Sequence, residues 1–247
     1  MSATLEVRQL VKRFGGLVAT DHFDLALPQG ETHALIGPNG AGKTTVMGQL
    51  TGEILPDSGS IVFNGKDITR WSTPERALGG IARSYQITQL LEGFTVLENV
   101  MLMVQAHQGH SFHGWRPARR QDALVQPALE ALRQVGLETR ADDDVTALAH
   151  GEHRQLELAM ALAMQPQLLL LDEPLAGMSH VESMQMVALL QGLKGKYTML
   201  LVEHDMQAVF SLADRVSVLV YGHVIACGTP AEVQIDDKVR EAYLGDH

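Results

Sequence analysis

Eight consecutive residues near the start of the chain have the spacing of a phosphate-binding loop. The run Gly37-Pro38-Asn39-Gly40-Ala41-Gly42-Lys43-Thr44 fits the pattern G-x-x-x-x-G-K-[ST], in which the glycines let backbone N–H groups point at a phosphate. We expect a helix to begin near Lys43 and to add the positive end of its dipole. Lys43 would then reach the β- and γ-phosphates of a nucleotide, the Thr44 hydroxyl would ligate Mg²⁺, and Thr45 belongs to the same predicted site.

Two further clusters of reactive residues follow short apolar runs. Asp172 and Glu173 follow four leucines, and His204 comes shortly after the apolar run 198–202. Asp172 can hold Mg²⁺ through water, and Glu173 can orient or deprotonate a water that attacks the γ-phosphate. His204 can hydrogen-bond the γ-phosphate and hold that water in line. Taken alone, either cluster can also be a solvated strand end or a structural histidine; taken together, they indicate a nucleoside triphosphatase rather than a kinase.

A parallel sheet must position these residues. The runs 32–36, 168–171 and 198–202 are short, apolar and bounded by polar residues, as are strands buried on both faces, and ligands bind at the carboxyl ends of such strands. Apolar–polar alternation in the N-terminal quarter predicts a small antiparallel sheet. Helical spacing of apolar residues between about 95 and 165 predicts an inserted helical lobe.

Length and composition exclude several other classes of protein. The 247 residues are 45% hydrophobic and 19% charged, which excludes a disordered chain. The formal net charge of −10 argues against a protein that wraps nucleic acid. The single cysteine, Cys227, excludes an internal disulfide framework. No run reaches the roughly 20 apolar residues of a membrane span, and no signal peptide is recognised, so we expect a chain that is soluble in itself.

In this order, the three clusters resemble the nucleotide-binding subunit of an ABC transporter. The resemblance covers essentially the whole chain. It implies ATP and Mg²⁺ as cofactors and an α/β fold of the P-loop NTPase type, with an N-terminal antiparallel β subdomain and an inserted helical lobe. We expect one domain over residues 1–247: a catalytic core lobe (1–86 and 166–229), a helical lobe with a signature motif (87–165) and a short tail (230–247).

The resemblance implies roles for two further side chains. Phe14 matches the aromatic residue on which adenine stacks, the alternative being an ordinary core phenylalanine. Gln86 matches the glutamine that senses the γ-phosphate and Mg²⁺ and leads into the helical lobe. With Thr44 and Asp172, Gln86 would complete the metal site.

The signature motif departs from its usual sequence, Leu-Ser-Gly-Gly-Gln. Here the five residues are Leu148-Ala149-His150-Gly151-Glu152. The motif presents a helix N-terminus to the γ-phosphate bound on a partner subunit, and Gly151 can still do so. Ala149 lacks the serine hydroxyl, however, and Glu152 places a negative charge near an anionic ligand unless its carboxylate points away. Ser179 stands where the next loop of the family holds an acid.

Several segments resemble the ATPases of branched-chain and hydrophobic amino-acid importers. They are residues 13–17, 172–178, 203–206 and 242–245. The resemblance implies a second ATPase subunit (a copy or a paralogue), integral membrane permease subunits and, indirectly, a periplasmic solute-binding protein, at the cytoplasmic face of the bacterial inner membrane and without nucleic acid. Two alternatives stay open: the ATPase of a lipid- or lipopolysaccharide-exporting complex, and a catalytically weak regulatory subunit.

Residues 107–120 carry histidines and arginines that suggest other functions. His107, His110 and His113 have no acidic neighbour, so we expect a solvated loop rather than a metal site. The arginines at 116, 119 and 120 can face water or anionic lipid headgroups, and we favour the solvated face.

Overall fold

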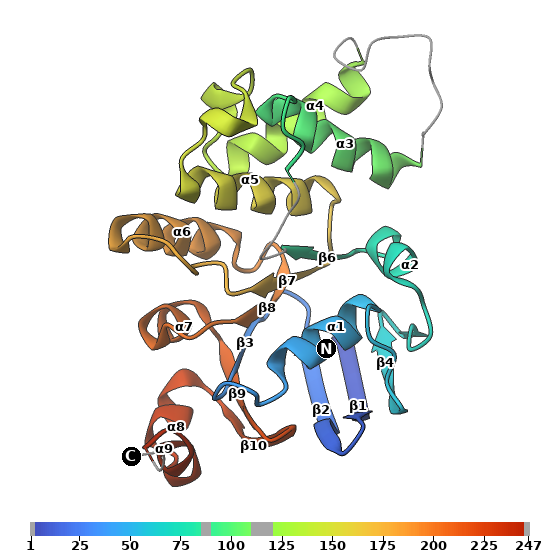
Figure 1. Ribbon diagram of the computed structural model, residues 1–247, viewed down its shortest axis with the longest axis vertical. Helices are drawn as coiled ribbons and strands as arrows, with labels where there is room; N and C mark the ends of the chain where they lie inside the picture. The colour runs from blue at the N-terminus through green and yellow to red at the C-terminus, as the bar shows by residue number, and fades with distance from the viewer. Residues whose placement is uncertain (1–2, 85–89, 110–120, 245–247) are drawn as a thin grey trace.

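The main sheet has six strands in the order β10-β9-β3-β8-β7-β6 (Figure 1). The computed structural model describes residues 3–84, 90–109 and 121–244. The strands are β3 (Thr32–Ile36), β6 (Ile81–Ser84), β7 (Leu168–Asp172), β8 (Thr198–Val202), β9 (Arg215–Val220) and β10 (His223–Gly228). All but β10 run parallel. Every residue of β3, β7 and β8 is buried, which confirms the three predicted parallel strands.

The predicted antiparallel sheet is also present, with longer strands than the alternation indicated. Its order is β2-β1-β4-β5, and the strands are β1 (Ala3–Phe14), β2 (Leu17–Pro28), β4 (Ser58–Phe63) and β5 (Lys66–Asp67). The β1–β2 register shifts between Val7 and Leu10, where Gln9 has a φ of 50°. This irregularity breaks the period-2 pattern that sequence analysis relies on, so the strands continue beyond the point where the pattern stops.

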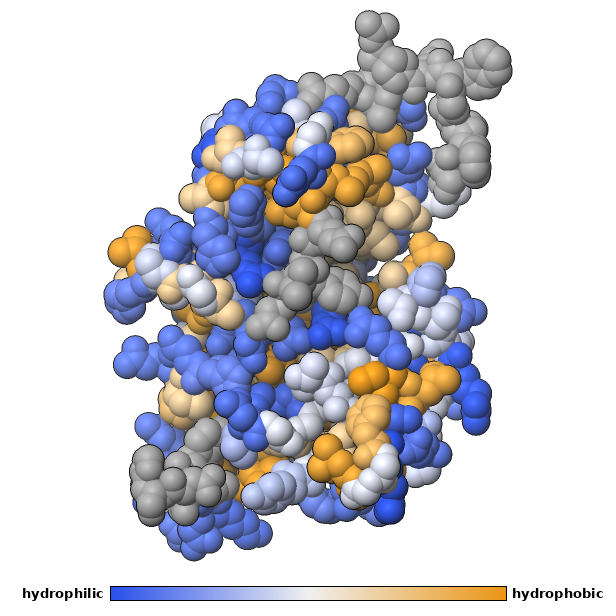
Figure 2. All heavy atoms as spheres, viewed as in Figure 1, coloured by the Kyte–Doolittle hydropathy of each residue, from blue (hydrophilic) through white to orange (hydrophobic). Residues whose placement is uncertain are grey.

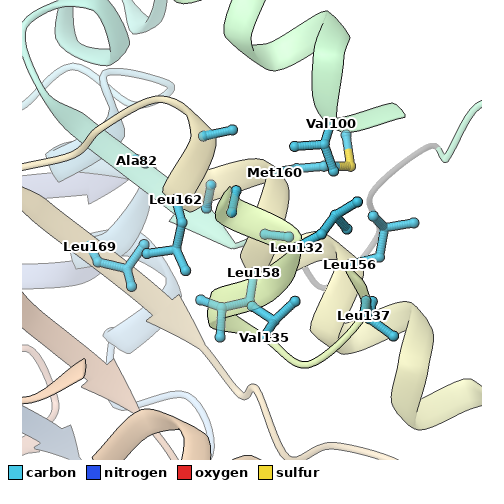
Figure 3. Close-up of a cluster of buried hydrophobic side chains, with 14 of the residues drawn as sticks. Ala82, Val100, Leu132, Val135, Leu137, Leu156, Leu158, Met160, Leu162 and Leu169 are labelled. Atoms are coloured by element: carbon cyan, nitrogen blue, oxygen red, sulfur yellow. The ribbon is translucent and has the colours of Figure 1, made fainter. Parts of the chain in front are cut away.

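Helices α3 (Val96–Gln108), α4 (Asp122–Gln134) and α5 (His150–Ala163) form the predicted helical region. Short 3₁₀ turns at Glu138–Arg140 and Val145–Ala147 connect α4 to α5. Side chains from all three helices and from β7 converge in one hydrophobic cluster (Figure 3). His107 lies in the last turn of α3 rather than in the expected loop, while residues 110–120 are outside the described part of the chain.

The remaining helices are α1 (Lys43–Thr51), α2 (Thr73–Leu78), α6 (His180–Leu193), α7 (Met206–Leu212), α8 (Pro230–Ile235) and α9 (Asp237–Leu244). Figure 1 shows α1 and the antiparallel sheet on one side of the main sheet and α6 and α7 on the other. Along β7, alternate side chains enter two cores: Leu169 and Leu171 pack in the cluster of α5 and α6, and Leu168 and Leu170 in the cluster of α1. The main sheet is therefore covered on both faces, which explains its uninterrupted apolar strands.

Most of the surface seen in Figure 2 is hydrophilic, and apolar residues gather around α3 and α4 and in a second group near β1, β2 and β4. Within residues 3–84, 90–109 and 121–244, no helix has the length and hydropathy that a membrane-spanning helix needs.

A buried arginine holds the C-terminal end of α1. Arg76, on α2, is only 1% exposed. Its guanidinium donates hydrogen bonds to the carbonyls of Gln49 (2.6 Å), Leu50 (2.9 Å), Thr69 (3.0 Å) and Trp71 (3.1 Å). Burial lowers the pKa of Arg76 to about 10, so the side chain is a cation at neutral pH. A cation there satisfies the last carbonyls of α1 and complements the negative end of its dipole.

Two glycines allow the loop between β3 and α1 to pack against both sheets. A Cβ atom on Gly37 would lie 2.1 Å from the carbonyl oxygen of Leu219 on β9. A Cβ on Gly42, whose φ is +109°, would lie 2.1 Å from the carbonyl oxygen of Ala19 on β2. By contrast, the Cβ position of Gly40 faces open space. Gly37 and Gly42 are therefore required by packing as well as by backbone conformation.

We expect Arg76→Met to lower the free energy of unfolding by about 3 kcal/mol or more, because two buried and two part-buried hydrogen bonds to carbonyls are lost. At this chain length such a loss corresponds to a melting temperature lower by roughly 6–12 °C. Thermal unfolding followed by circular dichroism measures it. Arg70→Met, which removes an exposed arginine nearby, is the matched control, and equal melting temperatures for the two variants would contradict the assigned role.

Gly42→Ala and Gly40→Ala form a second matched pair. Both place a side chain at positive φ, which costs about 1 kcal/mol or more. Only the Gly42 variant also clashes with backbone, so its loss of stability should exceed that of the Gly40 variant by about 2 kcal/mol or more. Chemical denaturation of both proteins without nucleotide tests this, and equal stabilities would show that β2 does not constrain the loop.

Candidate nucleotide-binding and hydrolysis site

The predicted phosphate-binding loop follows β3 directly and ends where α1 begins at Lys43. The Lys43 ammonium donates hydrogen bonds to the carbonyls of Gly37 (2.7 Å) and Pro38 (3.0 Å). Burial lowers the pKa of Lys43, and the charges of Glu173 and Asp172 oppose this shift. The fold thus brings Lys43 and the acidic cluster, which are far apart in the sequence, close enough for their charges to interact.

The first turn of α1 offers groups that suit an anion and a cation. It contains no acidic residue, so the positive end of the helix dipole is not neutralised by the helix itself. Thr44 is exposed and Thr45 half-buried. In the described part of the chain neither hydroxyl has a hydrogen-bond partner, which leaves both available to a ligand.

The acidic and histidine clusters meet at the carboxyl ends of two neighbouring strands. Asp172 ends β7 and pairs in register with Val202, which ends β8. Immediately beyond, His204 Nε2 lies 2.8 Å from Glu173 Oε1. The structure thus places in contact the two side chains predicted to activate and hold water.

The backbone at Glu173 is in the left-handed region, with a φ of 48°. For a residue with a long side chain this conformation costs free energy and is concentrated at functional sites. Two hydrogen bonds hold it: Glu173 N donates to Val202 O (2.8 Å), and Ala176 N donates to Glu173 O (3.0 Å). The turn directs the chain out of the sheet directly after Asp172.

Glu203 positions both clusters, a role that sequence analysis did not predict. The side chain is 5% exposed. Its Oε1 accepts a hydrogen bond from Leu175 N (2.8 Å), and its Oε2 accepts one from His204 N (2.9 Å). A single carboxylate therefore ties the loop after β7 to the loop after β8. A charged residue directly after an all-apolar run is the sequence signal for this role.

The Asp172 carboxylate is paired with an arginine from the adjacent strand. Arg83 Nη2 lies 2.5 Å from Asp172 Oδ2, and Arg83 Nη1 lies 3.0 Å from a carboxylate oxygen of Glu53. Among the described residues Asp172 Oδ1 accepts no hydrogen bond. No motif in the sequence indicates this ion pair.

The donor set fits a hard divalent cation bound together with a nucleotide. The Thr44 hydroxyl and the Asp172 carboxylate offer oxygen ligands, which Mg²⁺ prefers. Within residues 3–84, 90–109 and 121–244, no group of three or more His, Cys, Asp and Glu side chains could hold a metal alone. Oxygens from water and from a phosphate must complete the coordination, as is usual for Mg²⁺. Gln86, the other predicted ligand, lies outside the described residues.

The divergent signature motif lies at the start of α5, and Ala149 is the N-cap residue of this helix. Glu152 Oε2 accepts a hydrogen bond from Ala149 N (2.8 Å), and its Oε1 forms an ion pair with Arg140 (2.6 Å). The Glu152 carboxylate is therefore neutralised and turned back onto its own helix. Leu148 is buried and His150 is exposed.

The start of α5 is tied to the start of α6. Gly151 N donates a hydrogen bond to Glu182 Oε1 (3.1 Å), and Glu182 Oε2 accepts one from Ser179 N (2.8 Å). Ser179, where the family has an acid, thus acts as the N-cap residue of α6. Within the described part of the chain, the polar contacts of Glu152 and Gly151 go to α6, to Arg140 and to α5 itself, and not to the loop 37–44.

Phe14 lies at the end of β1 and is 49% exposed. The alternative of an ordinary core phenylalanine is therefore wrong. The Lys12 ammonium lies 5.5 Å from the centre of the ring, a distance at which cations bind aromatic faces. Stacking on adenine stays a prediction.

Residues 20–176 match the family model described as ABC transporter, and residues 223–247 match the model described as branched-chain amino acid ATP-binding cassette transporter. The chain is 38% identical over 251 residues to the high-affinity branched-chain amino acid transport ATP-binding protein LivG of Salmonella typhimurium, covering 98% of each chain. It is 35% identical over 249 residues to the corresponding protein BraF of Pseudomonas aeruginosa, again covering 98% of each chain.

Solved structures of ATP-binding cassettes have the same fold. A nucleotide-free cassette from an ABC transporter superposes with a TM-score of 0.87 at 30% identity, covering 99% of this chain and 100% of that one. A cassette in its ADP conformation gives a TM-score of 0.87 at 29% identity and covers 100% of both chains. The predicted fold class is thus confirmed. With the match of residues 20–176 and the relatives aligned over nearly their full length, the chain belongs to the ABC transporter family, as an ATPase whose hydrolysis is coupled to transport.

Proposed function

We propose that this ATPase energises an importer of branched-chain or other hydrophobic amino acids. The support for the substrate class is the match of residues 223–247 to the branched-chain amino acid cassette model and the names of the two relatives, which align with almost the whole chain. The observation that carries the hydrolytic role is the 2.8 Å contact between Glu173 and His204 beside the phosphate-binding loop.

In this proposal, ATP binds along the carboxyl edge of β3, β7 and β8. Lys43 and the backbone N–H groups of residues 37–42 hold the phosphates, with Phe14 stacked on adenine. Thr44, Asp172 and Gln86 would hold Mg²⁺, which would supply positive charge beside the phosphates. Lys43 exchanges its present hydrogen bonds to Gly37 and Pro38 for phosphate oxygens.

Glu173 acts as the general base for the attacking water, and His204 holds that water against the γ-phosphate. The water must lie within hydrogen-bond reach of both side chains, and their 2.8 Å contact allows this. Glu203 keeps His204 in place through its backbone N–H (2.9 Å). A carboxylate that is held by a strained turn and a positioned partner needs little reorganisation before it takes the proton.

A second ATPase subunit, either a copy or a paralogue, completes the site in this proposal. Two subunits pair head to tail, so that the residues 148–152 of one face the γ-phosphate bound by the other. Neutralisation of Glu152 by Arg140 reduces the repulsion that its charge would exert on the phosphate. The pair acts beneath integral membrane permease subunits at the cytoplasmic face of the inner membrane, and a periplasmic binding protein delivers the solute to the permease.

We expect Glu173→Gln to bind ATP, to hydrolyse it about 10²–10⁴-fold more slowly, and to accumulate an ATP-bound dimer, because the general base is lost while the binding groups remain. ATP turnover in the assembled complex and size-exclusion chromatography with ATP measure these effects. Glu241→Gln, which changes an exposed residue of α9, is the control and should behave as wild type. Unchanged turnover in the Glu173 variant would refute its assigned role.

Ala149→Ser tests whether the divergent signature motif contributes to ATP hydrolysis. The hydroxyl restores an N-cap on α5, which stabilises the protein by about 1 kcal/mol, and it adds a donor for the phosphate on the facing subunit. We expect both a higher melting temperature and an altered ATP turnover in the assembled complex. A stabilised protein with unchanged turnover would mean that this half-site does not contribute to hydrolysis.

A further inference from the structure

We propose that Arg83 is a positioning residue of the magnesium site, which holds one oxygen of Asp172 so that the other faces the cation. The inference rests on the proposed function in one respect, the assignment of Asp172 to Mg²⁺. It concerns a residue that none of the predicted motifs uses and whose partner lies 89 positions away in the sequence.

The ion pair is almost fully enclosed. The side chain of Arg83 is 10% exposed and that of Asp172 8%. β6 and β7 are parallel neighbours, with Arg83 paired in register with Leu170. The long arginine side chain therefore reaches two residues further along, to the carboxylate at the end of β7. Burying two charges costs desolvation free energy, and the attraction between them offsets this cost only when the geometry of the pair is well matched.

A second carboxylate fixes the orientation of the guanidinium. Nη1 of Arg83 contacts Glu53, just beyond the end of α1, at 3.0 Å, and Nη2 contacts Asp172 Oδ2 at 2.5 Å. Because the guanidinium is planar and rigid, an anchor at one nitrogen sets the direction of the other. An ammonium is a point charge with no such fork, so lysine can supply the charge without the orientation.

This arrangement leaves Asp172 with one free oxygen. Oδ2 is taken by Arg83, while Oδ1 accepts no hydrogen bond among the described residues. Carboxylates that serve a metal are themselves held by outer hydrogen-bond partners, whose loss weakens metal affinity by about 10–100-fold. Arg83 has the chemistry and the position of such a partner. It also links the metal site to Glu53, so the end of α1 and the end of β7 share one side chain.

The test measures metal binding rather than turnover, with Mn²⁺ as the probe for Mg²⁺. Electron paramagnetic resonance gives the Mn²⁺ affinity of the protein–ADP complex, and ADP affinity is measured separately with a chelator present. We expect Arg83→Met to weaken Mn²⁺ binding by about 10-fold or more while leaving metal-free ADP affinity within about twofold of wild type. Arg133→Met, which removes an exposed ion-paired arginine on α4, is the matched control and should change neither.

If Arg83→Met fails to fold, Arg83→Lys provides a second test of the proposal. It preserves the charge beside Asp172 but not the fork, so the folded protein should still bind Mn²⁺ several-fold more weakly than wild type. Mn²⁺ affinity equal to or tighter than that of wild type, in Arg83→Met or, if that variant does not fold, in Arg83→Lys, would overturn the proposal.

Asp172→Asn separates this inference from the proposed function. If the asparagine variant retains wild-type Mn²⁺ affinity, the assignment of Asp172 to the metal fails, and the role of Arg83 fails with it. If the asparagine variant loses Mn²⁺ but the Arg83 variants do not, only the role of Arg83 is wrong.

Discussion

The parallel register of β3, β8 and β7 is the constraint on which the rest of the molecule depends. Each strand is buried along its whole length, and alternate side chains of β7 and β8 enter two separate hydrophobic clusters. A slip of one residue would exchange the faces of a strand and disrupt both clusters. Since apolar packing fixes the register, it also fixes where each strand ends. The phosphate-binding loop, Asp172 and the histidine loop are consequently brought to one edge by residues that never touch a nucleotide.

Charged side chains inside the protein then set the details of that edge. Arg76 holds the end of α1, Glu203 ties together the loops after β7 and β8, and Arg83 joins Asp172 to Glu53. Each replaces water as the partner of polar groups that the fold buries. Substituting any of these three side chains therefore changes both the geometry of the site and the stability of the fold. The exposed ion pairs on α4 differ, because they contribute little to stability. The geometry of the site therefore depends on these buried charges as well as on the sequence motifs.

Sequence patterns predicted the parts of the structure that depend on local spacing. The buried strands and the loop before Lys43 follow from short sequence patterns, and the structure confirms them. Glu173 and His204 were each predicted at a strand end, and their 2.8 Å contact is a finding of the structure. Arg76, Glu203 and Arg83 each have a partner 26 to 89 positions away, and no local sequence pattern predicts a contact over that separation. The full extent of β1 does not follow from the alternation of apolar and polar residues, because a bulge near Gln9 interrupts it. The direction of the Glu152 carboxylate depends on Arg140, 12 positions earlier, and no spacing rule relates the two.

The packing of Gly37 and Gly42 against the carbonyls of Leu219 and Ala19 has a genetic consequence. The shape of the loop is set by β9 and β2 during folding, so the conformational entropy of the loop is lost before a nucleotide arrives. Alleles that shift either carbonyl would have the phenotype of a nucleotide-binding defect although the altered codon lies outside the motif. In a screen for transport-deficient strains, mutations on β2 and β9 should therefore fall into the same class as mutations in the loop, and suppressors of one should be sought in the other.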